Sequence, residues 1–529
     1  MDRRRFLLRS SGAVALPLVM SGLPMHAFDG PMLADMFNTA EETDRVLVLV
    51  QLNGGNDGVN TVLPLDQEAA YMAARPGLAI PFSKTLRLND TTALHPQMTG
   101  LQALFGEKKL AIVNGVGYPN PNLSHFRSTD IWMSGSASNQ VVSSGWIGRY
   151  LSTAYAGYPD GFPNATMPDP IAIQMSAVVS LALTGASQQS MGIALQDPET
   201  FYALVNSTKA TGQGLPTSAE ARANVEYVRE IQAKSEQYSA VIKAAADKAS
   251  NIADYPDPLV NRLAGQLQVV ARMIAGGLKT RVYVVSLGGF DTHAAQVEEG
   301  NPEGGLHATL LNYVSEAMAA FQRDLEAHRV DDRVVTMTFS EFGRRVDANL
   351  SLGTDHGTAA PMFVMGTPVV DGVLTAYPSL SDVEQGNLKM AVDFRQIYAS
   401  ILEQWFGANP AVLREVLFQD VSTMPIIKAG STDPTSVSAD AIAGALTLMP
   451  VVPNPVRDEA RLRYSVADGN DARLDVFDAL GFHVATVTGQ LNDGVLEAPF
   501  VVRGLPSGTY IVRLSNGRTA VTQPMVVVR

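Results

Sequence analysis

The run Val46-Leu47-Val48-Leu49-Val50-Gln51-Leu52 is aliphatic almost throughout, and it stops at Asn53-Gly54-Gly55-Asn56-Asp57-Gly58. A strand that is apolar on both faces is typical of a parallel sheet covered on both sides. Four similar runs follow, at 110–113, 281–287, 334–339 and 362–365. Between them, apolar residues recur three or four positions apart at 218–253, 257–276 and 308–328. This alternation predicts an α/β fold with a mostly parallel central sheet flanked by helices.

The chain has 529 residues, which is too long for one ordinary core. We expect the α/β domain to span residues 40–430, with a helical cap or insertion at about 150–275. A stretch rich in Ser, Thr, Asp and Pro predicts a linker at 431–447. From 448 to 529, short alternating runs broken by Gly, Asn and Asp predict a small immunoglobulin-like β-sandwich.

Composition excludes several classes of function. The 39 basic and 52 acidic side chains give a net charge of −13, so attraction to a phosphate backbone is absent and we expect no nucleic-acid partner. The chain has no cysteine, which excludes disulfides, thiolate metal sites and cysteine nucleophiles. Any metal must therefore be held by nitrogen and oxygen ligands.

The N-terminus has the pattern of an export signal. A basic start is followed by an apolar run at 13–20 and small residues near Ala27, which predicts a signal peptide at 1–27. Arg3 and Arg4 ahead of Phe6 and Leu7 resemble a twin-arginine signal, which implies the twin-arginine export machinery as a partner. An uncleaved membrane anchor is the alternative. However, the apolar run is shorter than the roughly 20 residues of a spanning helix, so we expect no transmembrane helix in the mature protein.

Acidic residues and histidines lie just beyond several of the predicted strands. They are Asp57, Asp291, His293, Glu341, Asp355 and His356. Ligands bind at the carboxyl ends of the strands in such sheets, so we expect these side chains to meet. Each alone has a simpler explanation as a turn former or a structural ion pair. Together they predict a site for a divalent metal, because carboxylates and imidazoles bind Zn²⁺ or Mn²⁺ and two ions can assist an in-line displacement.

Ser124 is the candidate nucleophile. It follows the strand at 110–113 and a turn rich in Pro and Asn, and it precedes a stretch at 126–133 that could be a helix. The amides and dipole of a helix N-terminus would receive an anionic ester oxygen, and Arg127 could grip an oxyanion with two hydrogen bonds. The alternative is that Ser124 only caps the helix. His125 could be a ligand, an acid–base group or a packed ring.

Five segments together resemble the DUF1501 family: 52–61 (LNGGNDGVNT), 124–126 (SHF), 289–293 (GFDTH), 340–344 (SEFGR) and 353–357 (GTDHG). The resemblance runs from about residue 45 to residue 407. That family looks like a relative of the alkaline phosphatase and sulfatase superfamily. The resemblance implies an alkaline-phosphatase-like fold and the hydrolysis or transfer of phosphate or sulfate esters with one or two metal ions.

The resemblance also implies roles for single residues. Asp291 and His293 would correspond to the central ligands of the superfamily and His356 to its last histidine. Glu341 stands where those enzymes carry Asp-His-Gly, and Ser124 resembles their nucleophile. Asn53 stands where a ligand Asp is usual, and Phe342 replaces a histidine. One tightly held ion (Zn, Mn or Ca) therefore accounts for the residues at least as well as two.

The C-terminal segment resembles the type IX secretion C-terminal sorting domain. The resemblance rests on Pro453-Asn454-Pro455, on 476–481 (VFDALG) and on 505–510 (LPSGTY). It implies the type IX secretion machinery as a partner and a route through the periplasm to secretion or the cell surface. A plain immunoglobulin-like accessory domain is the alternative.

Two functions follow from these patterns. The first is an exported metal-dependent hydrolase of phosphate or sulfate esters, acting on a small-molecule or polymer-linked ester. The second is a non-catalytic surface binding or scaffold protein on a degenerate hydrolase fold, which the residues Asn53 and Phe342 favour.

Overall fold

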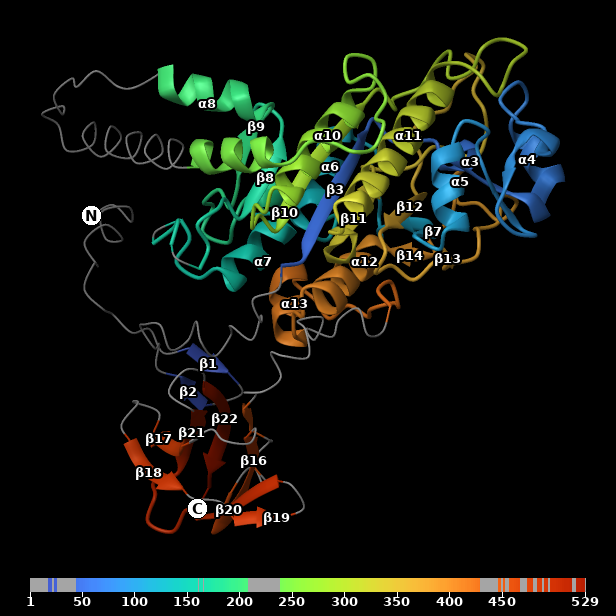
Figure 1. Ribbon diagram of the computed structural model, residues 1–529. Helices are drawn as coiled ribbons and strands as arrows, with labels where there is room; N and C mark the ends of the chain where they lie inside the picture. The colour runs from blue at the N-terminus through green and yellow to red at the C-terminus, as the bar shows by residue number, and fades with distance from the viewer. Residues whose placement is uncertain are drawn as a thin grey trace, which may run out of the picture. The chain divides into compact units, whose positions relative to one another are not determined.

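The computed structural model divides the chain into two compact units, Met1–Thr432 and Asp433–Arg529 (Figure 1). The described residues are 18–20, 23–25, 44–159, 161–164, 166–207, 238–428, 446–448, 451, 456–466, 473–478, 483–487, 490–492, 495–515 and 520–528. Most of the predicted signal peptide lies outside these ranges, although β1 (Leu18–Met20) and β2 (Leu23–Met25) pair as antiparallel strands. Most of the predicted linker, and residues 208–237 of the predicted cap, also lie outside them.

A nine-stranded mixed sheet forms the centre of the first unit. Its main strands are β3 (Val46–Asn53), β7 (Leu110–Gly117), β10 (Val282–Gly288), β11 (Val334–Phe339) and β12 (Ala360–Met365). The order is β13-β7-β12-β11-β3-β10-β8-β9, with β14 beside β7. The shorter strands are β8 (Ala172–Met175), β9 (Ile193–Leu195), β13 (Gly372–Val373) and β14 (Val392–Asp393). β3 is central and runs parallel to β10 and β11. The predicted α/β fold with a largely parallel sheet is therefore confirmed.

The strand β12 is antiparallel to both of its neighbours, β11 and β7. The apolar run at 362–365 predicts a strand but not its direction, because burial on both faces produces the same pattern in either direction. The direction matters for the site, because it places the first residue of β12 at the edge where the parallel strands end.

Helices cover both faces of the sheet. α5 (Thr99–Gly106), α10 (Arg262–Ala275) and α11 (Leu306–Ala327) pack on one face, and α10 and α11 lie in front of the strands in Figure 1. The other face is covered by α6 (His125–Ser134), α7 (Trp146–Ala154), α12 (Phe394–Ser400), the π-helical turn η5 (Ile401–Trp405) and α13 (Pro410–Leu417).

Smaller elements complete the first unit. They are α3 (Gly58–Thr61), β4 (Val62–Pro64), η1 (Leu65–Gln67), α4 (Glu68–Ala74), η2 (Phe82–Lys84), β5 (Leu86–Arg87), β6 (Thr92–Leu94), η3 (Leu181–Leu183), α8 (Pro198–Ser207) and η4 (Asp331–Arg333). β4, β6 and β5 form a small separate sheet.

The predicted helix at 257–276 begins later than the apolar spacing suggests. It starts at Arg262, after Asn261 caps it by accepting a hydrogen bond from the amide of Ala264 at 3.1 Å. Pro258 disfavours the helical conformation of Asp257, the residue before it, and the Asn261 cap sets the start of the helix.

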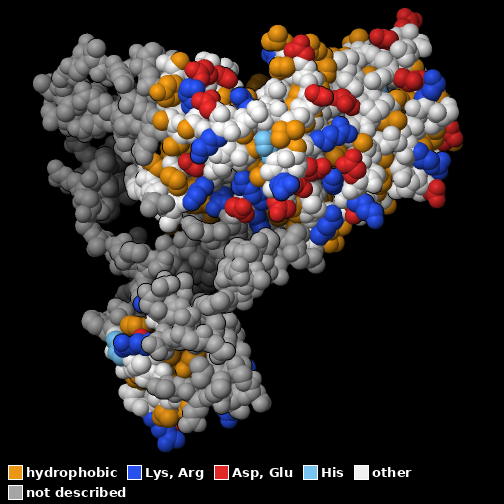
Figure 2. All heavy atoms as spheres, viewed as in Figure 1, with side chains coloured by type: hydrophobic (Ala, Val, Ile, Leu, Met, Phe, Trp, Pro, Cys, Tyr) orange, Lys and Arg blue, Asp and Glu red, His pale blue; other side chains and the backbone are white. Residues whose placement is uncertain are grey.

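Charged side chains of both signs are mixed over the part of the first unit drawn in Figure 2. Among the described residues, no helix is both long and apolar enough to cross a membrane.

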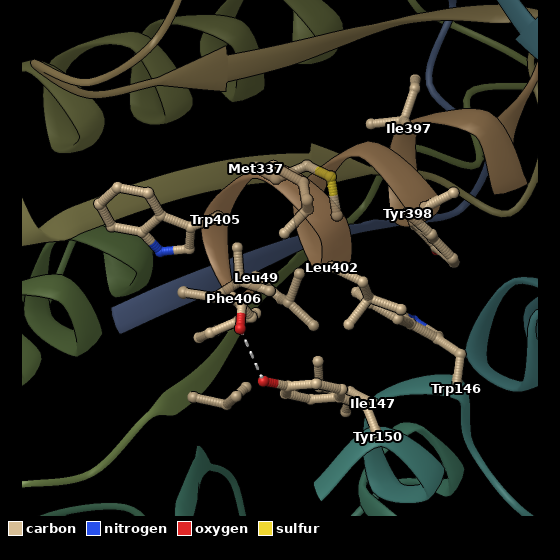
Figure 3. Close-up of a cluster of buried hydrophobic side chains, with 14 of the residues drawn as sticks. Leu49, Trp146, Ile147, Tyr150, Met337, Ile397, Tyr398, Leu402, Trp405 and Phe406 are labelled. Carbon is tan, nitrogen blue, oxygen red and sulfur yellow. Dashed lines mark hydrogen bonds between the residues drawn. The ribbon is translucent and has the colours of Figure 1, made fainter. Parts of the chain in front are cut away.

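Alternate residues of β3 enter two different cores. Leu47 and Leu49 pack with one cluster, whereas Val46, Val48 and Val50 pack with the other. Figure 3 shows Leu49 in the first core, among Met337, Trp405, Tyr398 and Trp146. This period of two on a doubly covered strand is what the continuous apolar run predicts.

The C-terminal unit consists of two four-stranded antiparallel sheets. One contains β15 (Leu446–Leu448), β16 (Glu459–Val466), β20 (Val495–Val501) and β19 (Gln490–Asn492), in that order. The other contains β18 (His483–Val487), β17 (Arg473–Asp478), β21 (Gly508–Ser515) and β22 (Ala520–Val527). Alternate side chains such as Leu462, Val476 and Val512 are fully buried in one shared core. The predicted C-terminal antiparallel β structure is confirmed.

Candidate metal centre

Strand direction brings the predicted polar residues to one edge of the sheet. Gly288 of β10 lies opposite Asn53 of β3, and Phe339 of β11 lies opposite Gln51. The loops after these strands carry Asp291 and Glu341. Since β12 runs the other way, His356 before its start reaches the same edge. β7 runs parallel to β11, and the loop after it leads to Ser124 and His125 at the start of α6.

Asp291 lies at the centre of three histidines. Its Oδ2 is 3.5 Å from Nε2 of His125, and its Oδ1 is 3.2 Å from Nε2 of His293 and 3.4 Å from Nε2 of His356. Ligand atoms of His125, Asp291 and His356 all lie within 4.8 Å of one another. We call these four residues the Asp291 cluster.

The second ring nitrogen of each histidine, Nδ1, contacts an oxygen atom of a neighbouring residue. Nδ1 of His125 is 2.9 Å from Oε1 of Glu341, and Nδ1 of His356 is 2.8 Å from the carbonyl of Leu123. Nδ1 of His293 is 3.4 Å from Oδ1 of Asp355. Because a carboxylate and a carbonyl only accept hydrogen bonds, neutral His125 and His356 carry their protons on Nδ1 and have a lone pair on Nε2. Metal-binding histidines commonly have this arrangement. His293 donates from its own Nε2 to Nε2 of His356 at 2.8 Å.

The spacing of the cluster suits a small divalent ion. Around a tetrahedral ion with bonds of about 2.1 Å, neighbouring ligand atoms lie about 3.4 Å apart. The three contacts of Asp291, at 3.2 to 3.5 Å, match that separation. One pair is closer, because Nε2 of His293 and Nε2 of His356 are 2.8 Å apart. The two imidazoles and one carboxylate of His125, His356 and Asp291 form a donor set that favours Zn²⁺ or Mn²⁺ over Ca²⁺, which prefers oxygen.

Glu341 and Asp355 lie behind the histidines. Glu341 is 3% exposed, and its Oε1 also accepts a hydrogen bond from the amide of Gly54 at 2.8 Å. Asp355 accepts a hydrogen bond from Asn349 at 3.2 Å, and this bond lowers the pKa of the Asp355 carboxyl. Both carboxylates therefore hold a histidine of the cluster in position through its Nδ1.

Arg344 holds the loops of the site together. Its guanidinium is buried and donates to Oδ1 of Asp291 at 2.6 Å, to the carbonyl of Gly55 at 2.7 Å and to the carbonyl of Thr354 at 2.9 Å. Partial burial raises the pKa of Asp291, but Arg344 outweighs this effect and lowers the pKa below its ordinary value. Asp291 is therefore an anion at neutral pH.

Asp57 does not join the cluster. It is fully buried, and its Oδ2 accepts hydrogen bonds from Arg75 at 2.5 Å and from Gln296 at 2.6 Å. Burial by itself would raise the pKa of Asp57, but the Arg75 cation holds it below its ordinary value. Asp57 is thus half of an internal ion pair beneath the glycine-rich loop.

Ser124 occupies the N-cap position of α6, in extended backbone conformation, but its side chain makes no capping hydrogen bond. The side chain is exposed beside the cluster, between Leu123 and His125 in the chain. Arg127, in contrast, donates to the carbonyls of Ser138 (3.0 Å) and Gln140 in the loop after α6.

The sequence predicts two residues of the site incompletely or not at all. It leaves open whether His125 is a ligand, an acid–base group or a packed ring, whereas the structure places it in the Asp291 cluster at the start of α6. Gln296 gives no signal at all. Its buried amide accepts hydrogen bonds from Thr292 and Thr354, both at 2.9 Å, and donates to Asp57. It thereby links the loop of Asp291 and His293 to the loop of Asp355 and His356.

Phe342 packs against two histidines of the cluster. Its buried ring lies with its centroid 4.9 Å from that of His125 and 4.6 Å from that of His356.

A hollow of about 500 Å³ opens in front of the cluster, lined by Asn53, Gly54, His125, Phe126, Thr129, Asp130, Asp291 and Glu341.

Comparison with known protein families identifies a domain in the C-terminal unit. Residues 450–528 match the secretion system C-terminal sorting domain. This match supports export, with secretion or display at the cell surface, and suggests the type IX secretion machinery as a partner. No curated protein matches the chain.

Several solved structures show weak likeness. Titin M4 is 14% identical, with 16% of this chain and 95% of that chain covered and a TM-score of 0.13. CopC from Methylosinus trichosporium OB3b is 18% identical, with 16% and 93% covered and a TM-score of 0.13. Ps i-CgsB in complex with k-i-k-neocarrahexaose is 9% identical, with 81% and 85% covered and a TM-score of 0.35.

The first unit has a clear family match. Residues 44–417, well over half of the chain, match DUF1501, which is described as a protein of unknown function. The chain therefore belongs to the DUF1501 family.

Proposed function

We propose that this protein is an exported metal-dependent hydrolase of phosphate or sulfate esters, related in fold to the alkaline phosphatases and sulfatases. The observation that carries the proposal is the convergence of three histidine Nε2 atoms on the carboxylate of Asp291. Each histidine is oriented through Nδ1, and the cluster faces an open hollow. A purely structural cluster would not need to be both oriented in this way and open to solvent.

The residues divide into those that would bind the ion and those that would act on the ester. His125, Asp291 and His356 would bind one divalent ion, with His293 beside Asp291, and the ion would supply charge stabilisation for the transferring group. Glu341 keeps His125 in the tautomer that presents Nε2, and Asp355 lies beside Nδ1 of His293. The arrangement favours one ion over two, because Phe342 supplies no ligand and Asp57 is paired with Arg75.

Ser124 is the group best placed to attack the ester. Its hydroxyl is exposed and makes no capping bond, and the next residue in the chain, His125, lines the hollow. The free amides and positive end of the ten-residue helix α6 favour an anionic oxygen at the same point. Arg127 has no part in this proposal, because its guanidinium binds the loop after α6.

The alternative is a surface binding or scaffold protein on a degenerate hydrolase fold. One observation favours it: Arg344 donates to Oδ1 of Asp291, which leaves Oδ2 as the freer oxygen of that carboxylate. Turnover separates the two functions, since a scaffold would bind metal but hydrolyse nothing.

The first experiment is elemental mass spectrometry on protein purified without chelator. We expect about one equivalent of zinc or manganese, lost in Asp291→Asn and His125→Gln. His328→Gln, at the end of α11 and outside the cluster, is the matched control and should retain the metal. Absence of metal after loading with zinc or manganese would refute the hydrolase.

A screen of phosphate and sulfate esters completes the test. We expect turnover that is lost on chelation and in Ser124→Ala, with unchanged circular dichroism. Metal binding without turnover of any ester would instead support the scaffold.

A further inference from the structure

We propose that the surface around Ser124 binds a neutral, hydroxyl-rich chain, that is, a carbohydrate. The inference rests on the proposed function, because it names the class of alcohol from which the phosphate or sulfate would be removed. It is carried by a second hollow and an exposed aromatic ring, one on each side of Ser124.

The second hollow has a volume of about 620 Å³. Its walls are the loop between β7 and α6, Thr358 and the segment 384–390. Leu123 lines this hollow, and its carbonyl also accepts the hydrogen bond of His356 at 2.8 Å. Leu123 and His125 are the neighbours of Ser124 in the chain, and each lines a different hollow. Ser124 therefore lies in the chain between a residue of one hollow and a residue of the other.

The walls of this hollow are held in place by hydrogen bonds. The Tyr118 hydroxyl lies 2.7 Å from Oγ of Ser128 and donates to the carbonyl of Asn122 at 3.1 Å. Thr358 donates to the carbonyl of Leu388 at 2.6 Å, which fastens the opposite wall. The hollow is therefore formed before any ligand arrives, which reduces the entropic cost of binding.

The chemistry of the walls suits an uncharged ligand rich in hydroxyl groups. Asn120 and Gln385 present exposed amides, each able to donate and accept hydrogen bonds. Asn387 is 9% exposed, and its side-chain oxygen has no hydrogen-bond partner. The charged lining residues are one Glu and one Lys, so the walls carry no excess of either charge that would select an ion. Pro119 and Pro121 add apolar surface for the C–H faces of a sugar ring.

Phe126 supplies an aromatic surface on the other side of Ser124. Its side chain is 88% exposed and lines the hollow in front of the cluster. Single exposed hydrophobic residues are common on proteins and mean little alone. Here the ring lies beside polar groups in the hollow, where one of its faces can stack on a sugar ring while the hydroxyls reach Thr129 and Asp130.

The test is affinity electrophoresis of the full chain through gels that contain an unsulfated polysaccharide: agarose, β-glucan, xylan or galactomannan. We expect at least one of the four to retard the protein. Phe126→Ala and the double variant Asn120→Gly/Gln385→Gly should each bind about ten-fold more weakly. Asn120 and Gln385 both have φ of +53°, a conformation that glycine adopts freely, so the double variant should stay folded.

Matched controls show whether the effect belongs to the hollows. Gln188→Gly also replaces an exposed glutamine at positive φ (+64°), but outside both hollows. Leu350→Ala removes another exposed apolar side chain. Both should be retarded like wild type. No retardation by any of the four polysaccharides, or equal retardation of all variants, would overturn the proposal.

Removal of the metal with a chelator separates this inference from the proposed hydrolysis. Binding in the hollows does not need the metal, so we expect the chelated protein to be retarded like the untreated protein. Retardation that depends on Phe126 in a protein without metal or turnover would leave a carbohydrate-binding protein. Metal and turnover without retardation would leave a hydrolase of another class of ester.

Discussion

Two aspartates of this protein have a similar sequence context but very different surroundings in the structure. Asp57 and Asp291 both follow a buried strand and a pair of glycines. The Asp57 side chain is fully buried against Arg75, whereas the Asp291 side chain is 48% exposed and is surrounded by histidines. The first position is that of one partner of a buried ion pair, and the second is where we propose a metal ligand.

Asp57→Asn separates these roles. It leaves the buried Arg75 cation without its counter-ion, so we expect a loss of about 3–5 kcal/mol in the free energy of unfolding. The metal content of the folded protein should not change. Urea unfolding and elemental mass spectrometry measure the two effects. Asp90→Asn, at an exposed ion pair with Arg87, is the control and should change stability by less than about 0.5 kcal/mol. Loss of metal at unchanged stability would show that Asp57 is a ligand after all.

At the scale of elements, the site is a junction of loops that follow β3, β10 and β11 or precede β12. Arg344 binds backbone carbonyls of the loops after β3 and before β12, and Gln296 links the two loops that carry Asp291 and His356. The positions of the proposed ligands thus depend on side chains that are not themselves proposed as ligands.

Gln296→Ala tests this dependence. It removes the hydrogen bonds to both threonines and to Asp57, so we expect zinc affinity to fall by about 10- to 100-fold, as is typical for groups that position ligands. Competition with a chromophoric chelator measures the affinity, and thermal melting verifies the fold. The matched control is Gln322→Ala, a buried glutamine of α11 that bonds to Glu326. A similar loss of zinc affinity in both variants would mean that general destabilisation, not ligand position, is responsible.

At the scale of the whole molecule, buried histidines make the first unit sensitive to acid. Burial, followed by repulsion from His307, lowers the pKa of His95 to about 3. Burial likewise lowers the pKa of His307 to about 4. The unfolded chain, with ordinary pKa values near 6.5, binds more protons than the folded chain between these limits. The stability of the unit therefore falls as pH decreases below about 6.5.

His95→Asn should reduce this sensitivity. Nδ1 of His95 accepts the amide of Gln97 at 3.1 Å, a bond that the Asn oxygen can replace without titrating. We expect the drop in unfolding free energy between pH 7 and pH 5 to shrink by about 2 kcal/mol. Tryptophan fluorescence follows this unit alone, because all three tryptophans (Trp132, Trp146 and Trp405) belong to it. His483→Asn, in the C-terminal unit, is the control. An unchanged drop in His95→Asn would contradict the assignment.

The sequence by itself determined the α/β class, the main strands and the edge of the sheet where Asp291, His293 and His356 meet. These features follow from hydrophobic periodicity, which is local, and from the rule that ligands bind at the carboxyl ends of strands. The antiparallel C-terminal strands follow in the same way from alternation with a period of two.

Only the tertiary structure decided which side chains face the site. Asp57 turns inward to Arg75 and to Gln296, which is 239 positions away, while Glu341 reaches His125 across 216 positions. Arg127 binds the loop after its own helix instead of facing the hollow. The orientation of a loop residue is set by such distant partners, and their pairing arises only when the whole sheet has formed. The local periodicity of the sequence indicates which strand residues are buried. It does not indicate which distant residues pair with one another.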